Sequence, residues 1–103
     1  MTVSVVTVAA GRSTHLRRQL DGLARSTRTP DEHIVVAMGD PEVADVVAAA
    51  KSPARVVPMD VGSGRLPVAE ARNLGARAAS SDLLVFLDVD CIPSPELLER
   101  YID

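Results

Sequence analysis

Hydrophobic residues along this chain gather in short runs that are separated by segments of mixed polarity. The first run, residues 3–9, is a nearly unbroken β-branched stretch, and Gly11 follows it. Such a run is typical of a strand whose two faces are both buried in a parallel sheet. Shorter apolar runs stand at residues 33–38, 55–59 and 83–87. The pattern therefore predicts four strands.

A helical spacing fills the segments between these runs. Leu16, Leu20 and Leu23 fall on one face of a helix that we expect to end near Ser26. At its start, the hydroxyl of Ser13 or Thr14 would accept hydrogen bonds from free backbone amides. Three more helices are predicted: one that Asp40 and Pro41 begin and Pro53 ends, one at residues 68–79, and one at residues 95–101.

The alternation of strands and helices with short links indicates the α/β fold class. We predict a Rossmann-like parallel sheet with right-handed crossovers, in the strand order 3-2-1-4 and flanked by helices. A chain of 103 residues is the length of one ordinary domain, so residues 1–103 are expected to form a single unit.

The overall composition argues against several functional classes. The chain is 47% hydrophobic and has a net charge of only -3, which favours neither a disordered acidic tail nor a nucleic-acid binder. Phe86 and Tyr101 are the only aromatic residues, and Cys91 is the only cysteine, too few for base stacking or for a disulfide framework. The apolar opening at residues 1–10 is too short to span a bilayer and lacks a basic leader. We therefore expect a cytoplasmic protein with a small-molecule partner.

Ligands of an open parallel sheet bind beyond the carboxyl ends of its strands, where the strand order reverses. In the order 3-2-1-4 that point lies between the first and fourth strands. The residues that the topology would gather there are Ala9 to Arg12, Met38 to Asp40, the loop at residues 62–65, Arg72, and Asp88 to Asp90.

Asp88 and Asp90 are the most informative candidates in this set. Two carboxylates two residues apart at a strand end would point to the same side of the pleat, where they could share a hard divalent cation with phosphate oxygens and water. An equally economical interpretation is that Asp88 caps a turn and Asp90 caps the helix after Pro93. Spacing alone does not decide between the two.

Three segments together resemble the first half of an inverting family 2 glycosyltransferase of the GT-A fold, which uses a nucleotide-diphospho-sugar donor. They are Val-Ser-Val-Val at residues 3–6, Ala-Arg-Asn-Leu-Gly at residues 71–75, and the strand that ends in Asp88-Val89-Asp90. By resemblance, Asp88 would contact the ribose or the metal, Asp90 would help bind Mn²⁺ or Mg²⁺, and Arg72 would lie near the nucleotide. The metal would lower the charge of the leaving diphosphate.

The chain also departs from that family's pattern. Members usually carry Pro-x-Tyr-Asn-Arg after the first strand, and here only Arg12 matches, so the aromatic that could stack on the base is missing. Where members carry Asp-Asp-Gly-Ser after the second strand, this chain has Met38 for the second acid, and Asp40 stands two positions later. Asp40 either replaces that acid or caps a helix. The nucleotide-binding candidates are therefore Ala9, Arg12, Asp40, Arg72 and Asp88.

The family draws its acceptor site and its general base from the part of the domain that follows the Asp-x-Asp. This chain ends thirteen residues after Asp90, so no residue can be assigned the base that inversion requires, and we expect part of a longer catalyst. A later strand would normally cover residues 83–87. Without it we expect self-association along that edge, weakened by Val85→Lys, unless the helix at residues 95–101 shields it.

Two other functions stay open. Residues 9–14 resemble the phosphate-cradling loop of sugar-nucleotidyltransferases, although that family has arginine where His15 stands and a Pro-Lys pair where Pro30 precedes Asp31. A non-catalytic nucleotide-binding or interaction domain is the third possibility. His15 and His33 are expected to be solvated, and Cys91 to be a packing residue rather than a nucleophile.

Overall fold

A computed structural model describes residues 1–62 and 64–102 of the chain, which form four strands and four helices in alternation. The strands are β1 (Val3–Ala9), β2 (Glu32–Met38), β3 (Arg55–Met59) and β4 (Leu83–Phe86). The helices are α1 (Ser13–Ala24), α2 (Glu42–Ala49), α3 (Val68–Ala78) and α4 (Leu97–Ile102). Each strand and each helix was predicted from the sequence, with ends that differ by a few residues.

The strands form one parallel sheet in the order β3-β2-β1-β4, which confirms the predicted topology. β1 lies inside the sheet, with Val5 opposite His33 of β2 on one side and opposite Val85 of β4 on the other. Its β-branched run suits this position, because β1 is covered on both faces and paired on both edges. β4 pairs with β1 alone among the described residues, so it forms an edge of the sheet.

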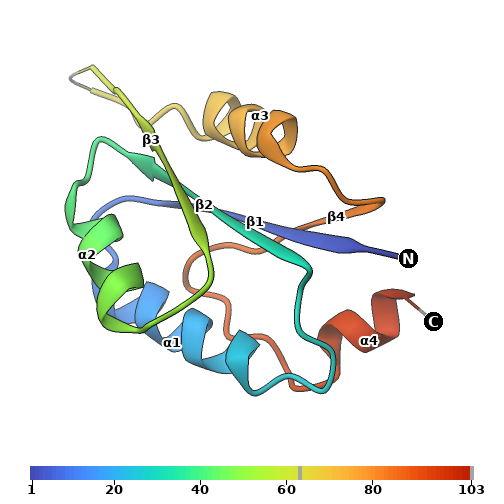
Figure 1. The fold of residues 1–103 in the computed structure, drawn as a ribbon. Coiled ribbons are helices and arrows are strands. Elements are labelled where there is room, and N and C mark those ends of the chain that lie inside the picture. The colour runs from blue at the N-terminus through green and yellow to red at the C-terminus, as the bar shows by residue number, and fades with distance from the viewer. Residues whose placement is uncertain (63, 103) are drawn as a thin grey trace.

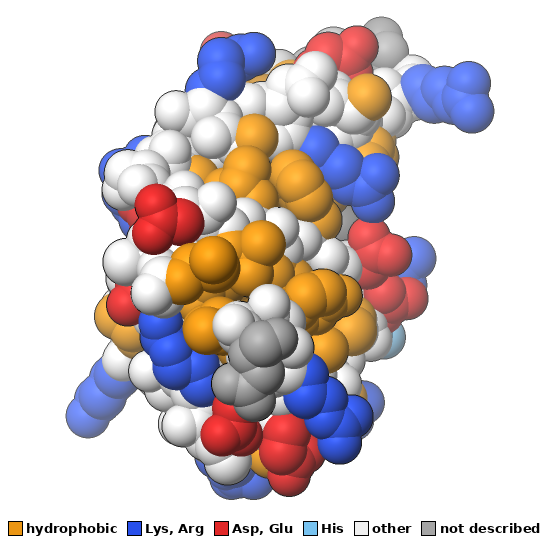
Figure 2. All heavy atoms as spheres, turned by 90° about the vertical axis from the view of Figure 1, so that its right-hand side faces the viewer, with side chains coloured by type: hydrophobic (Ala, Val, Ile, Leu, Met, Phe, Trp, Pro, Cys, Tyr) orange, Lys and Arg blue, Asp and Glu red, His pale blue; other side chains and the backbone are white. Residues whose placement is uncertain are grey.

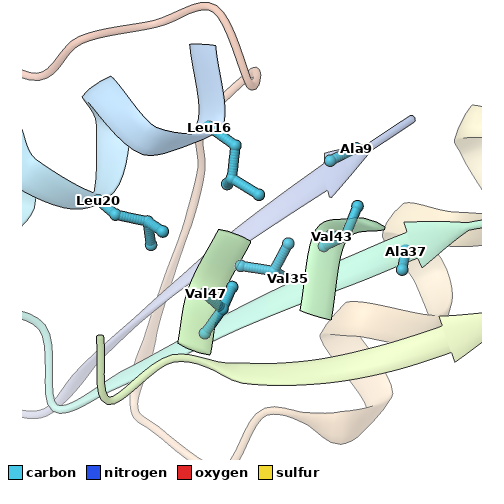
Figure 3. Packing of buried hydrophobic residues seen from close by; sticks show 7 residues of the cluster. All are labelled: Ala9, Leu16, Leu20, Val35, Ala37, Val43 and Val47. Atoms are coloured by element: carbon cyan, nitrogen blue, oxygen red, sulfur yellow. The ribbon is translucent and has the colours of Figure 1, made fainter. Parts of the chain in front are cut away.

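Helices cover the two faces of the sheet unequally (Figure 1). α3 lies on one face, against β1 and β2, whereas α1, α2 and α4 lie on the other. Figure 3 shows how Leu16 and Leu20 of α1 and Val43 and Val47 of α2 converge on Val35 at the centre of β2. This layer holds α1 in place beside the carboxyl end of β1.

Close packing of α3 depends on Gly75. A Cβ atom at this position would lie 2.4 Å from Val6 Cγ1 and 3.2 Å from Val36 Cγ2, so no larger residue fits without movement. Ala71, one turn earlier, is fully buried. The small residues of the Ala-Arg-Asn-Leu-Gly segment therefore let α3 pack closely on the sheet.

Several local predictions were wrong. Neither Ser13 nor Thr14 caps α1, because Arg12 occupies the N-cap position and no side chain supplies a capping bond there. His33 is only 7% exposed rather than solvated, because it shares the side of β2 that carries Val35 and Ala37, which α1 and α2 cover. Val85 is 5% exposed and belongs to the core, so Val85→Lys would disrupt the fold instead of testing the edge.

α4 is shorter than predicted and begins at Leu97. Its Leu98 is fully buried against Val3, Val5 and Leu87, on the face of the sheet that α1 also covers. Leu84 and Phe86 point to the opposite face and stay exposed, so α4 shields one face of β4 and leaves the other open. Within the described residues, no helix has the length and apolar character needed to cross a membrane.

Candidate functional site

The candidate site lies beyond the carboxyl ends of β1 and β4, where the strand order reverses. β1, β2 and β3 follow one another toward one edge of the sheet, whereas β4 is added on the other side of β1. The chain therefore leaves β1 and β4 in different directions. Ligands of open parallel sheets bind at such a point, and we call the space beyond these two strand ends the crevice. The residues that follow these two strands, together with α3 above the sheet, are positioned to face a ligand there.

Asp88 and Asp90 lie on a turn rather than on the strand. The Leu87 amide still donates to the Val6 carbonyl, at 3.0 Å, and the Cys91 amide then donates to the Asp88 carbonyl, at 2.9 Å, which closes the turn. Strand alternation ends before Asp90, so the argument that the two carboxylates share one side of a pleat was wrong. Their proximity follows instead from the four-residue turn from Asp88 to Cys91, which we call the aspartate turn.

The aspartate turn is linked to α3 by an ion pair. Arg72 Nη2 lies 3.0 Å from Asp88 Oδ1, and the two side chains are 46% and 70% exposed. An exposed pair of this kind adds little stability, because both ions remain hydrated. Its importance is positional: a guanidinium and a carboxylate stand together at the crevice, where the guanidinium can also reach a phosphate.

The capping interpretation of the two aspartates was also wrong. The Asp88 carboxylate accepts its hydrogen bond from Arg72, and only the backbone carbonyl of Asp88 takes part in the turn. Asp90 is exposed and accepts no side-chain hydrogen bond from the part of the chain that the structure describes. Since α4 begins only at Leu97, Asp90 caps no helix.

Asp40 joins the loops that follow β1 and β2. Its Oδ1 accepts the amide of Glu42, the first residue of α2, at 3.0 Å, although Pro41 rather than Asp40 occupies the N-cap position of that helix. Its Oδ2 accepts the Gly11 amide at 2.8 Å, so both carboxylate oxygens have backbone partners. Gly11 adopts a φ of 65°, a conformation that favours glycine, and this allows its amide to face Asp40.

The remaining candidates are placed less tightly. Arg12 is exposed at the start of α1 and makes no ion pair with any other described residue. The side chain of Ala9 is 2% exposed and packs beside Leu16 in the core (Figure 3), so only its backbone can face a ligand. The candidate loop at residues 62–65 includes Ser63, which lies outside the described residues.

The donor set fits a shared divalent cation rather than a complete protein cage. Among the described residues, no group of three or more histidine, cysteine or acidic side chains could hold a metal. Asp88 and Asp90 supply hard carboxylate oxygens, which suit Mn²⁺ and Mg²⁺, and phosphate oxygens and water commonly complete such a shell. Cys91, partly buried against the core, confirms its predicted packing role.

Sequence reasoning missed one residue that contacts the aspartate turn. Gln19 is fully buried, and its side-chain amide reaches the backbone carbonyls of Asp88 and Cys91. The available signal was its position: Gln19 stands in the same helical stripe as Leu16, Leu20 and Leu23, where a polar residue must face the core.

At the opposite end of the sheet, where the strands begin, acidic residues anchor β1 and β2. A hydrogen bond from Arg28, at 2.8 Å, is the main cause that lowers the pKa of the Asp31 carboxyl. Hydrogen bonds from the Ser80 amide and the Ser4 hydroxyl lower the pKa of Glu32. These groups hold the amino-terminal ends of β1 and β2 together and lie far from the crevice.

The fold of the chain matches those of solved glycosyltransferases. The structure of TarS from S. aureus aligns with a TM-score of 0.85 at 20% identity, over 99% of this chain and 31% of that chain. The mannosyltransferase PcManGT from Pyrobaculum calidifontis, in complex with GDP-Man and Mn²⁺, aligns with a TM-score of 0.82 at 19% identity, over 97% of this chain and 31% of that chain. At these identities the likeness shows the fold.

Two further matches are closer in sequence. Glucosyl-3-phosphoglycerate synthase from Mycobacterium tuberculosis, in complex with Mn²⁺, UDP-Glc and phosphoglyceric acid, aligns with a TM-score of 0.73 at 27% identity, over 95% of this chain and 37% of that chain. Validoxylamine A glucosyltransferase from Streptomyces hygroscopicus subsp. limoneus is 35% identical over an alignment of 103 positions, and the match covers 97% of this chain and 23% of that protein. The chain thus spans a quarter to a third or so of the length of these proteins.

A family model described as glycosyl transferase family 2 matches residues 4–103, which include every strand and helix apart from the first residue of β1. Of the three segments that carried the resemblance in sequence, the match covers the Arg72 segment and the aspartate turn completely and residues 3–6 apart from Val3. The chain belongs to glycosyl transferase family 2.

Proposed function

We propose that this chain binds a nucleotide-diphospho-sugar donor together with Mn²⁺ or Mg²⁺ in the crevice beyond β1 and β4. The observation that carries the proposal is the aspartate turn, which presents two exposed carboxylates beside the guanidinium of Arg72 at the point where the strand order reverses. A diphosphate needs positive charge on more than one side, and this arrangement supplies Arg72 directly and a cation through Asp90.

Each residue has a distinct part in this proposal. Asp90 has no described partner and is free to ligate the cation, while Asp88 is oriented by Arg72 and would contact the ribose or the same cation. Arg12 and Asp40, on the loops after β1 and β2, would approach the nucleoside, and Ala9 would contribute through its backbone. When bound, the cation neutralises charge that develops on the leaving diphosphate.

The relatives narrow the donors worth testing. Solved relatives were crystallised with UDP-Glc and Mn²⁺ or with GDP-Man and Mn²⁺, and the curated relative is a glucosyltransferase. We propose that the complete protein transfers the sugar with inversion to an acceptor, and that it does so in the cytoplasm.

Calorimetry with UDP and GDP, with and without Mn²⁺, tests the proposal. We expect binding in the high micromolar range or weaker, because an open crevice leaves most of the ligand solvated. We expect that binding to be lost with a chelator and in Asp90→Asn, which removes the charge and keeps the shape. Asp45→Asn, on the exposed side of α2, is the matched control and should bind as the unaltered chain does.

Equal nucleotide binding with chelator, or in Asp90→Asn, would overturn the role of the cation. Release of pyrophosphate from a nucleoside triphosphate and a sugar phosphate would overturn the transferase in favour of the nucleotidyltransferase alternative. Absence of any nucleotide binding by the unaltered chain at millimolar concentration would overturn the donor site itself and favour an interaction domain.

A further inference from the structure

Three buried polar side chains form a hydrogen-bonded network that crosses the core beneath the candidate site. It runs from His33 on β2 to Thr7 on β1 and on to Gln19 on α1, and these side chains are 7%, 0% and 0% exposed. Thr7 Oγ1 lies 3.2 Å from His33 Nε2 and 2.7 Å from Gln19 Oε1. Three polar side chains in an otherwise apolar layer are costly to bury unless all of their hydrogen bonds are made.

The network of hydrogen bonds ends on the aspartate turn. Gln19 Nε2 donates to the Asp88 carbonyl at 2.7 Å and to the Cys91 carbonyl at 3.2 Å. These carbonyls belong to the first and last residues of the turn that presents Asp88 and Asp90. One side-chain amide therefore holds both ends of the turn from below, while Arg72 holds the Asp88 carboxylate from above.

The direction of every hydrogen bond in this network is determined. An amide nitrogen can only donate, so Gln19 Nε2 faces the two carbonyls and Oε1 must accept from Thr7. The Thr7 hydroxyl has a single hydrogen, which it gives to Gln19, so it can only accept from His33. His33 therefore carries its proton on Nε2. Both polar atoms of the Gln19 side-chain amide are used, which orients Gln19 uniquely.

We infer that Gln19 is a positioning residue for the cation site: it sets the spacing and orientation of Asp88 and Asp90 without touching the ligand. The inference rests on the proposed function, because it assumes that the aspartate turn holds a cation. Its physical reason is that, among the described residues, only the side chains of Gln19 and Arg72 hydrogen-bond to the turn. Further along the chain, Thr27 bonds to Pro95 and Gly22 of α1 approaches Pro93, so α1 and the residues just after it guide that stretch (Figure 1).

Mn²⁺ binding in the presence of UDP, followed by electron paramagnetic resonance of free Mn²⁺, tests the inference. Gln19→Met keeps the length of the side chain and removes both donors, and we expect a roughly tenfold weaker Mn²⁺ affinity, as for other residues that orient metal ligands. Thr7→Val removes the hydroxyl that orients Gln19 and should weaken Mn²⁺ in the same direction. Thr7→Ser restores a hydroxyl and should restore the affinity.

Ser4→Ala is the matched structural control. Ser4 carries a fully buried hydroxyl on the same strand, but it bonds to Glu32 at the amino-terminal end of β2. Its loss should therefore lower the melting temperature without changing Mn²⁺ affinity. Equal Mn²⁺ affinity in Gln19→Met and the unaltered chain, both folded by circular dichroism, would overturn the positioning role. A different result, no Mn²⁺ binding by the unaltered chain, would overturn the proposed function on which the role depends.

Discussion

At the scale of single residues, His33 shows how the surroundings of a side chain can differ from what its neighbours in sequence indicate. The residue stands at the start of an apolar run, a position where exposure cannot be read from periodicity. In the sheet it pairs with Val5 and faces the same side as Val35 and Ala37, beneath α1 and α2. Burial disfavours the charged imidazolium and lowers the pKa of His33 from about 6.5 to about 4.

This depressed pKa predicts a loss of stability in mild acid. Between those two values the unfolded chain binds a proton that the folded chain excludes, so the free energy of unfolding should fall as the pH falls. From about pH 7 to about pH 5 the contribution of His33 is about 2 kcal/mol. Urea titrations across this range would measure it. The interval stays above the acidic range in which Asp31 and Glu32 take up protons.

Two substitutions separate His33 from other sources of pH dependence. The glutamine in His33→Gln does not titrate. The free energy of unfolding of this variant should therefore lose most of its dependence on pH between about pH 5 and about pH 7, whatever its absolute value. His15→Gln, which alters a residue outside the buried network, should keep it. A slope that survives unchanged in His33→Gln would show that another group is responsible.

Part of the candidate site could be predicted from the sequence. The residues that could be found belong to short local motifs, and the contact that could not be found joins distant parts of the chain. Asp88, Asp90 and Arg72 could be found because their motifs are local and the strand order brings them to the carboxyl end of the sheet. The bond from Gln19 to the turn could not be found, because it joins residues 69 and 72 positions apart whose meeting depends on the path after β4. Periodicity showed only that position 19 faces inward.

At the scale of elements, runs of β-branched and apolar residues predicted the strands well, and the helical stripes predicted the helices. The ends were less accurate, because a helix end is decided by local backbone geometry rather than by periodicity. Arg12, which makes no side-chain capping bond, occupies the N-cap position of α1 where a serine or threonine was expected. β4 ends one residue early because the chain turns at Asp88 to present the carboxylates.

Two glycines in helices test the role of close packing by α3. Alanine favours a helix over glycine by up to about 1 kcal/mol, so Gly→Ala is stabilising unless the added methyl meets a neighbour. At Gly75 the methyl would meet Val6 at 2.4 Å on the sheet. Overpacking of this kind typically costs about 1–3 kcal/mol, so Gly75→Ala should lower the free energy of unfolding.

Gly22 in α1 is the matched control for Gly75. A methyl there would lie 3.4 Å from Pro93 Cδ, an ordinary van der Waals contact. Gly22→Ala should therefore be neutral or stabilise the chain by up to about 1 kcal/mol. Chemical denaturation of both variants provides the comparison, and equal effects of the two substitutions would contradict the account of α3 packing.

At the scale of the whole molecule, the strand order explains both the site and an exposed surface. Because β4 is added beside β1, the order reverses there and opens the crevice, but the same placement leaves β4 at the edge. α3 covers β1 and β2 and leaves Leu84 and Phe86 36% and 47% exposed. Figure 2 shows hydrophobic side chains gathered on the side of the molecule that includes β4 and α4, with charged side chains around them.

This surface leads us to predict that the isolated chain associates with itself along β4. Unpaired backbone groups and two exposed apolar side chains favour pairing with a second copy. β4 has only four residues, so the contact should bury less than the roughly 800 Å² per partner of a stable complex. Association should therefore be weak and visible by light scattering as a molar mass that rises with protein concentration.

Phe86→Lys should reduce this association, because it places a charge on the exposed face of β4 and leaves the buried Val85 in place. Leu66→Lys is the matched control: Leu66 is exposed to nearly the same extent, 46%, but lies in the loop before α3. The molar mass of Leu66→Lys should rise with protein concentration, as that of the unaltered chain does. The prediction is contradicted if the unaltered chain stays monomeric at high concentration while the β4 amides exchange freely with solvent. The exposed edge would then be tolerated, because four residues and two side chains bury too little area to offset the entropy lost on association.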